Sequence, residues 1–121
     1  MIELALVGIG GFIGACCRYL ITLFFLKVIP AFPFGTLCAN VVAGLLIGLL
    51  VGMNLDVKSR LFLVTGLLGG LSTFSAFSLE TVNMLNEARY LAAAANILLN
   101  VGVSLACVFL GMWIVKEFIR C

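Results

Sequence analysis

The third apolar segment of the chain ends in Gly69-Gly70-Leu71-Ser72-Thr73-Phe74-Ser75-Ala76-Phe77-Ser78. Two adjacent glycines and four hydroxyl residues weaken a helix in lipid, where a freed backbone N–H or C=O group finds no other partner. Such an interruption persists only where it is buried in protein or lines a cavity. We therefore predict a third membrane helix that is broken in mid-membrane. The alternative is a tight helix crossing whose hydroxyl groups bond back to their own backbone.

The composition of the whole chain indicates a membrane protein. Of its 121 residues, 64% are hydrophobic and 10% are charged, and the mean hydropathy is +1.33. A soluble domain has about 25% charged residues. Because about 20 apolar residues cross a hydrocarbon core, a chain of this length holds four spans with short connections. The predicted class is an all-α integral membrane protein with a single domain over residues 1–121.

Prolines and polar stretches set the limits of the four predicted helices. Pro30 and Pro33 bracket a short loop, because proline cannot continue the helical hydrogen-bond ladder. A polar loop follows at residues 54–60, and a second polar exit runs from Glu80 to Arg89. The predicted helices cover about residues 2–28, 34–53, 61–79 and 90–115.

Neither the N-terminus nor the cysteines indicate processing or covalent crosslinks. No basic segment or small-residue cleavage site accompanies the first apolar run, so we expect this run to remain in the mature protein. The cysteines are odd in number and lack the paired spacing of a metal site, which favours ordinary small membrane residues over disulfides or ligands. They are Cys16, Cys17, Cys38, Cys107 and Cys121.

The basic residues predict the orientation of the chain only weakly. Those expected on the side of the N-terminus are Lys58, Arg60, Lys116 and Arg120, and those expected toward the other side are Lys27, Arg89 and Arg18. The positive-inside rule needs a clear asymmetry to determine one orientation. Insertion in both orientations is therefore compatible with the sequence.

Two aromatic and two hydroxyl residues follow the paired glycines at helical spacing. Phe74 and Phe77 are three residues apart, as are Ser75 and Ser78, so a helix places the two pairs on adjoining faces. Aromatic ring edges are electropositive, and together with hydroxyl donors they can solvate a small anion without a full positive charge. On spacing alone, ordinary packing of the two rings is the favoured interpretation.

Amide side chains form polar stripes on two other spans. Asn96, Asn100 and Ser104 recur every four residues on the fourth span, and Asn40 lies on the second. Asparagine in mid-membrane is energetically costly, so it faces protein or a pore. Interhelical hydrogen bonding and pore lining remain open for the stripe on the fourth span.

The groups that the spans lack exclude several functions. No Asp, Glu or Lys stands in the middle of a span and the chain has no histidine, whereas a proton-coupled transporter normally needs such a group. No nucleophile has a base beside it, so we expect no enzyme. Arg18 is the deepest charge, either an interfacial anchor or a vestibule charge that concentrates anions.

Three motifs in order make the chain resemble the Fluc (CrcB) fluoride channels over essentially its whole length. The first is Gly10-Gly11-Phe12-Ile13-Gly14-Ala15-Cys16-Cys17-Arg18-Tyr19, and the second is Pro33-Phe34-Gly35-Thr36-Leu37-Cys38-Ala39-Asn40. The third is the stretch quoted above with Leu79 and Glu80 added. This third motif is far more specific than a glycine-rich membrane helix alone.

The resemblance implies a fluoride-selective channel that exports fluoride passively from a prokaryotic plasma (inner) membrane. It implies an antiparallel, dual-topology homodimer with two fluoride pores. It also implies one structural sodium ion, held at the dimer centre by the backbone carbonyl groups of Gly69 and Ser72. The lipid bilayer, fluoride and a second copy are the expected partners, and no nucleic acid is expected.

The same resemblance assigns residues to the pore. They are Asn40, Phe74, Ser75, Phe77, Ser78, Asn96, Asn100 and Ser104, with Arg18 in the vestibule. Family members often carry tyrosine or hydroxyl residues on the fourth-helix track, where this chain has two asparagines and ends the track at Val108. Two alternatives stand beside the channel: a small multidrug-type proton-coupled exporter, which should carry a membrane-embedded glutamate in its first helix, and a non-conducting accessory subunit.

Overall fold

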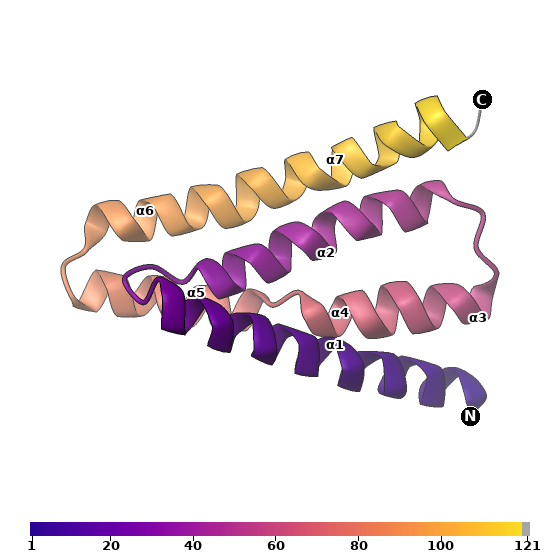
Figure 1. Ribbon diagram of the computed structural model, residues 1–121, viewed down its shortest axis with the longest axis horizontal. Coiled ribbons are helices and arrows are strands. Elements are labelled where there is room, and N and C mark those ends of the chain that lie inside the picture. The colour runs from indigo at the N-terminus through magenta and orange to yellow at the C-terminus, as the bar shows by residue number, and fades with distance from the viewer. Residues whose placement is uncertain (120–121) are drawn as a thin grey trace.

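The computed structural model describes residues 1–119 as helices joined by short loops (Figure 1). The first two spans are α1 (Ile2–Val28) and α2 (Phe34–Gly52). The third consists of α3 (Val57–Arg60), the π-helical η1 (Leu61–Leu68), α4 (Gly69–Leu71) and α5 (Phe74–Asn86). The fourth consists of α6 (Tyr90–Leu98), η2 (Leu99–Val103), α7 (Ser104–Ile114) and η3 (Val115–Ile119). All 4 spans are long and apolar enough to cross a membrane, which confirms the predicted all-α membrane class.

The third and fourth spans are longer than the sequence predicted. The third begins at Val57 instead of Leu61, because the Asp56 carboxylate caps it by accepting from the Ser59 N–H (3.2 Å). Hydrogen bonds from Ser59 also hold the pKa of the Asp56 carboxyl below its ordinary value. Helix α5 passes the predicted end at residue 79 and continues to Asn86, and the fourth span continues past residue 115 to Ile119.

Two extended residues separate α4 from α5. Ser72 has φ −76° and ψ 152°, and Thr73 has φ −151° and ψ 124°. The Thr73 hydroxyl then accepts from the Ala76 N–H (3.2 Å), which makes Thr73 the N-cap of α5. The hydroxyl residues of the third motif therefore start a new helix after the glycines.

Glycines permit the closest helix crossings. A Cβ atom added at Gly14 would lie 2.0 Å from the Leu67 carbonyl oxygen, and one added at Gly48 would lie 2.2 Å from that of Val108. These positions join α1 to η1 and α2 to α7, the two most extensive helix contacts in the fold. Small residues that let backbones approach are typical of helix association in membranes.

The end of α5 is a left-handed turn made without glycine. Ala88 has φ 58°, while its N–H donates to Leu85 O and the Arg89 N–H donates to Met84 O (2.8 Å). This is the Schellman arrangement, in which glycine is the usual residue at the left-handed position. Arg89 also donates from Nη2 to Ala31 O (2.6 Å), so it joins the two loops at that end of the molecule.

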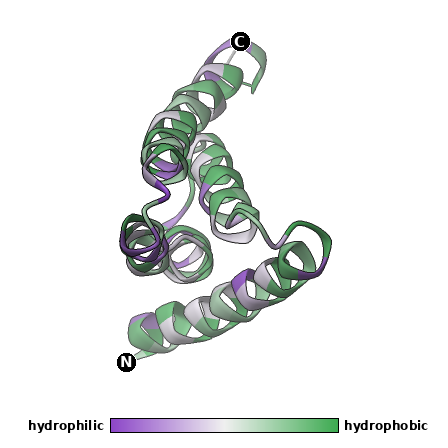
Figure 2. Cartoon of the chain, turned by 90° about the vertical axis from the view of Figure 1, so that its left-hand side faces the viewer, coloured by the Kyte–Doolittle hydropathy of each residue, from purple (hydrophilic) through white to green (hydrophobic). Residues whose placement is uncertain are grey.

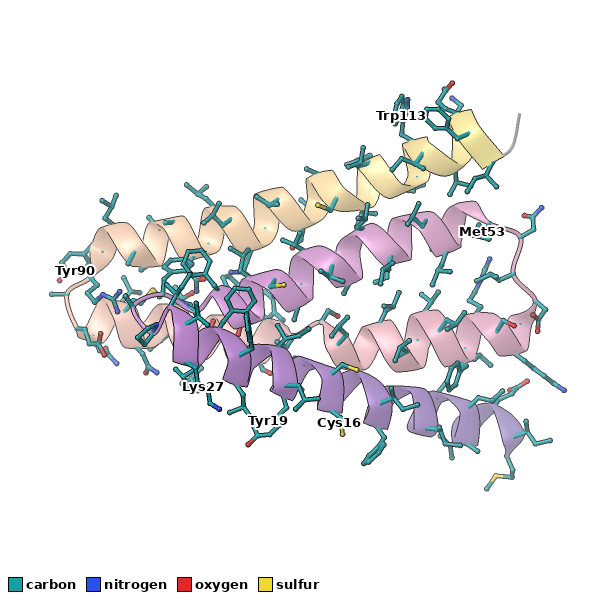
Figure 3. The ribbon with its side chains drawn as sticks, in the orientation of Figure 1. Cys16, Tyr19, Lys27, Met53, Tyr90 and Trp113 are labelled. Atoms are coloured by element: carbon teal, nitrogen blue, oxygen red, sulfur yellow. The ribbon has the colours of Figure 1, made fainter. Side chains whose placement is uncertain are left out.

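Large apolar side chains are exposed on all four spans, and Figure 2 shows the hydrophobic residues of the helices in green. Tyr90 lies at the end of the molecule that carries the loops around residues 29–33 and 87–89, and Trp113 lies toward the other end (Figure 3). Aromatic residues at both ends are typical of the two membrane–water interfaces. Cys16, Cys17, Cys38 and Cys107 are free, and Arg120 and Cys121 lie outside the described residues.

Candidate functional site

A groove with a volume of about 330 Å³ opens where α2, the start of α5 and the fourth span meet. Its lining contains Asn40, Ser72, Thr73, Phe74, Phe77, Asn100, Val101, Ser104 and Leu105. None of these side chains is ionisable in the physiological range. Hydroxyl, amide and aromatic side chains therefore line the groove, without a formal charge.

The two phenylalanines of the third motif lie together in this groove. Their ring centroids are 5.4 Å apart with an interplanar angle of 68°, so the edge of one ring faces the other. Phe77 is 7% exposed and Phe74 is 77% exposed. Phe77 is therefore packed within the subunit, whereas Phe74 presents nearly all of its ring to the groove and the surroundings.

Asn40 binds the backbone between α4 and α5. Its Oδ1 accepts from the Thr73 N–H (2.7 Å), and its Nδ2 donates to Thr73 O (3.1 Å). The second Nδ2 hydrogen goes to Asn100 Oδ1 (2.9 Å). One amide thus satisfies both backbone groups of an extended residue that has left the helical ladder.

The polar stripe of the fourth span divides into two buried asparagines and one hydroxyl group. Asn100 donates from Nδ2 to both Asn96 O (3.0 Å) and Asn96 Oδ1 (2.9 Å). Asn96 is fully buried, does not line the groove and donates to Thr81 Oγ1 (3.0 Å). Ser104 Oγ lies buried at the groove and has no hydrogen-bond partner among the described residues.

Two other residues predicted for the pore do not line the groove. Ser78 donates to Phe74 O of its own helix (2.9 Å). Such a bond back to the helix was the alternative role considered for the hydroxyl residues. Ser75 is exposed, and its Oγ lies 3.3 Å from Thr73 Oγ1. The structure therefore brings together five of the predicted residues: Asn40, Phe74, Phe77, Asn100 and Ser104.

The residues predicted for the vestibule and the cation lie at the end of α4 and on the part of α1 that contacts it. Arg18 Nε donates to Gly70 O (3.1 Å), so Arg18 contacts the last turn of α4. Ser72 uses its hydroxyl to donate to Leu68 O (3.0 Å), and a Cβ atom added at Gly69 would meet only Val64 O at 3.7 Å. No group of three His, Cys, Asp or Glu side chains gathers among residues 1–119.

Sequence reasoning missed a second polar contact between α2 and α5. The Thr36 hydroxyl donates to Glu80 Oε1, and Glu80 Oε2 is buried without a partner among the described residues. Glu80 lies inside α5, because the helix continues past the predicted end at residue 79. Thr36 is four residues before Asn40 on α2, a spacing that places both on one face and was a usable signal.

Thr81 was missed for a similar reason. It follows Phe77 by four residues and donates from Oγ1 to Phe77 O (2.8 Å), while it accepts from Asn96. The predicted helix end excluded it from the membrane span. The recurrence of Thr73, Phe77 and Thr81 every four residues was the signal that would have placed it.

Comparison with known proteins finds close relatives over most of the chain. The family model described as CrcB-like protein, Camphor Resistance (CrcB), matches residues 5–112. A Pyrococcus furiosus protein named fluoride-specific ion channel FluC is 48% identical over 120 residues, which cover 95% of this chain and 97% of the relative. Proteins with the same name from Clostridium perfringens (46% over 112 residues, 88% of each chain) and Agrobacterium fabrum (45% over 118 residues, 93% and 94%) are also similar.

Proposed function

The chain belongs to the CrcB-like family, and we propose that it is a fluoride-selective ion channel that exports fluoride passively. The relatives from bacteria and an archaeon support this function. With its four apolar spans, the chain is a multi-pass protein of the prokaryotic plasma membrane. Its function is to lower the cytoplasmic fluoride concentration.

The observation that carries the proposal is the groove beside the interruption of the third span. Ser104 brings a buried hydroxyl group that has no partner among the described residues, and Phe74 and Phe77 bring ring edges. Fluoride is small and accepts strong hydrogen bonds, so a few donors at close range can replace its water. Selectivity then comes from narrowness and donor geometry, as in filters built from fixed dipoles.

Passive conduction follows from the chemistry of the lining. Hydrogen fluoride enters a cell from acidic surroundings and dissociates at the higher internal pH, which traps the anion. The trapped anion leaves through the groove down its electrochemical gradient. The lining has no ionisable side chain that would exchange a proton with each anion, so no coupling step is required.

The complete channel is proposed to be an antiparallel homodimer. Large apolar side chains such as Phe12, Leu91 and Phe109 are 71%, 86% and 74% exposed in one subunit, which leaves apolar surface for lipid and for a second copy. The interruption is proposed to lie in mid-membrane, where two copies related by a two-fold axis meet. Its position between α4 and α5, near the middle of the third span, supports this arrangement.

A sodium ion at the dimer centre is proposed to be held by the carbonyl groups of Gly69 and Ser72 from both subunits. Helix α4 ends there, and the carbonyl groups at a helix C-terminus carry partial negative charge. The Thr73 N–H, which would bond to Gly69 O in a continuous helix, donates to Asn40 instead. Gly69 O thereby loses its helical donor, which suits it to a cation.

The proposed function is tested by anion efflux from liposomes that contain the purified full chain and either potassium fluoride or potassium chloride. With valinomycin present and equal pH on both sides, fluoride should leave rapidly and chloride no faster than from protein-free liposomes. Equal fluxes would contradict fluoride selectivity. Flux that requires a pH gradient would favour the coupled exporter, and no flux of either anion would favour the accessory subunit.

The sodium site is tested by substituting its two residues. Ser72→Ala keeps the carbonyl ligand and should preserve cation binding, whereas Gly69→Val adds bulk where the two subunits meet. Since a Cβ atom at Gly69 is tolerated within one subunit, loss of binding in Gly69→Val reports on the dimer centre. Gly102→Val is the matched control, because a Cβ atom there meets nothing within 4 Å. An anomalous-scattering search that finds no cation in the wild-type protein would refute the site and leave the channel function standing.

A further inference from the structure

A series of side-chain hydrogen bonds connects the start of α5 with the fourth span. The Thr73 N–H donates to Asn40 Oδ1 (2.7 Å), and Asn40 Nδ2 donates to Asn100 Oδ1 (2.9 Å). Asn100 Nδ2 then donates to Asn96 Oδ1 (2.9 Å). The series crosses from α2 to η2 and α6 through positions far apart in the sequence.

The series ends at Phe77 O, one helical turn after the Thr73 N–H at which it starts. Asn96 Nδ2 donates to Thr81 Oγ1 (3.0 Å), and Thr81 Oγ1 donates to Phe77 O (2.8 Å). We call the side chains of Asn40, Asn100, Asn96 and Thr81 the amide chain. Its two ends are the backbone of Thr73 and the backbone of Phe77, which enclose the first turn of α5.

The two ends of the amide chain determine the direction of every bond within it. The Thr73 N–H can only donate, so the Asn40 atom facing it must be oxygen. Phe77 O can only accept, so Thr81 must donate its one hydroxyl hydrogen. Both ends require the same polarity, and reversing any single amide would bring two donors or two acceptors together. One orientation of the chain is therefore strongly favoured.

The amide chain leaves few hydrogens for an anion. Both Nδ2 hydrogens of Asn40 are used, by Thr73 O and Asn100 Oδ1. Both Nδ2 hydrogens of Asn100 are used by the carbonyl and side-chain oxygens of Asn96. Asn96 itself is fully buried and does not line the groove. In contrast, the Ser104 hydroxyl is buried at the groove lining and has no partner among the described residues.

We propose that Asn96, Asn100 and Thr81 are positioning residues that act on the ion pathway through Asn40. The side-chain amides of Asn96 and Asn100 do not donate to fluoride. This inference rests on the proposed channel function. The amide chain holds the first turn of α5 at a defined angle to α2 and the fourth span, which places the rings of Phe74 and Phe77 along the groove. It also explains why two asparagines are compatible with conduction on the fourth span.

The bonds of the amide chain depend on one another because they are buried. A buried donor or acceptor that loses its partner pays the cost of its desolvation, and neighbouring bonds in a network of low dielectric weaken together. Removing a link far from the groove should therefore disturb Thr73 as much as removing a link beside it. Independent contacts with an ion would instead give losses that multiply when two residues are changed.

Thr81 provides the sharpest test, because it lies outside the groove lining and because valine and serine each preserve one of its two properties, shape or hydroxyl group. Thr81→Val keeps the shape and removes the hydroxyl group, whereas Thr81→Ser keeps the hydroxyl group. We expect fluoride efflux from liposomes to fall about fivefold or more in Thr81→Val, since one hydrogen bond contributes about that factor to an equilibrium, and Thr81→Ser to recover most of it. Thr65→Val is the matched control at an exposed threonine and should conduct normally.

The exchange rate of the Thr73 amide hydrogen, measured by NMR on the same variants, reports whether the hydrogen bond from Thr73 to Asn40 is intact. This measurement does not depend on ion flux. It should rise about fivefold or more in Thr81→Val and stay near the wild-type rate in Thr81→Ser. The double variant Asn96→Ala with Thr81→Val should lose no more flux than the stronger single variant.

The outcomes separate the two claims. A conducting wild type, with wild-type flux and slow Thr73 exchange in Thr81→Val, would overturn the positioning role and leave the channel function intact. A wild type that does not conduct fluoride, with faster Thr73 exchange in Thr81→Val, would overturn the channel function and any role in an ion pathway, and would leave only the positioning of Thr73 by the amide chain. Losses that multiply in the double variant would return Asn96 to an independent contact and overturn the inference.

Discussion

Phe74 and Phe77 put the same side chain into two different environments. Phe77 is 7% exposed and is packed in the subunit, whereas Phe74 is 77% exposed. Each ring can turn an electropositive edge toward the groove, but only Phe77 is also needed for packing. Substitutions at the two positions should therefore separate conduction from stability.

Phe74→Ile should reduce fluoride efflux at least tenfold and change the stability of the subunit little, because an aliphatic side chain has no electropositive edge. Phe77→Ile should reduce efflux similarly and also lower the free energy of unfolding by about 1–3 kcal/mol, since a buried ring is lost. Liposome flux and denaturation in detergent measure the two effects. Phe12→Ile is the control, a phenylalanine that is 71% exposed and does not line the groove. Normal flux in both groove variants would leave the rings with a packing role alone.

Ser104 is a hydroxyl group whose burial is not offset by a hydrogen bond among the described residues. Ser104→Ala removes this cost, so the subunit should be equally stable or more stable by up to about 1 kcal/mol. Fluoride efflux should nevertheless fall, because the groove loses its unused donor. Ser104→Thr, which keeps the hydroxyl group, should conduct better than Ser104→Ala. Unchanged efflux in Ser104→Ala would mean that fluoride does not use this hydroxyl.

The interruption of the third span is maintained by side chains that replace lost helical hydrogen-bond partners. In a continuous helix the Thr73 N–H would donate to Gly69 O, and the Phe74 N–H would donate to Gly70 O. Here Asn40 Oδ1 accepts from Thr73, and Arg18 Nε donates to Gly70 O. Side chains of α1 and α2 therefore stabilise an irregular backbone that lipid could not satisfy.

The C-terminal end of α5 carries strain that a single substitution should relieve. Ala88 has φ 58°, a region that costs a residue with a Cβ atom about 1 kcal/mol or more relative to glycine. Ala88→Gly should raise the free energy of unfolding by about 0.5–1 kcal/mol, and Ala94→Gly, on an exposed position inside α6, should lower it by about 1 kcal/mol. Denaturation midpoints in detergent compare the two variants. A lower midpoint for Ala88→Gly would contradict the strain assigned to this turn.

The four spans and the two groove phenylalanines, which are close in sequence, were predictable from the sequence. Hydropathy and the two prolines located α1 and α2, and the third motif located Phe74 and Phe77. The helix ends were less accessible, because Asp56 adds a turn before Leu61 and α5 continues through Glu80. Glu80 does not end the helix, because its side chain finds a hydrogen-bond partner in Thr36 on α2.

The amide chain could not be predicted from the sequence for a different reason. Asparagines at helical spacing suggest a stripe, but an amide can present either its oxygen or its nitrogen. The choice depends on Thr73 and Phe77, whose backbone groups meet the asparagines only after the helices pack. The stripe was therefore predictable, while its donors and acceptors were not.

The N-terminus, the end of η3 and the loop between α2 and α3 lie at one end of the molecule, and the other two loops lie at the opposite end (Figure 1). Among the described residues, Lys58, Arg60 and Lys116 belong to elements at the first end, and Lys27 and Arg89 belong to the other end, which is only a weak asymmetry. Three lysines appended to the C-terminus should impose one orientation and reduce activity, because an antiparallel dimer needs both. Co-expression with a variant that carries three extra lysines in the loop at residues 87–89 should restore it. Full activity of a chain with one proven orientation would refute dual topology.

The most direct test of passive, selective fluoride conduction is the reversal potential of the purified channel in a planar bilayer with a tenfold fluoride gradient at equal pH. We predict a reversal at the Nernst potential of a monovalent anion, about 59 mV, and no shift when a chloride gradient of the same size is imposed at constant fluoride. A reversal potential that follows the chloride gradient would contradict fluoride selectivity. A reversal potential that moves with a pH gradient, while fluoride is held equal on both sides, would contradict passive conduction.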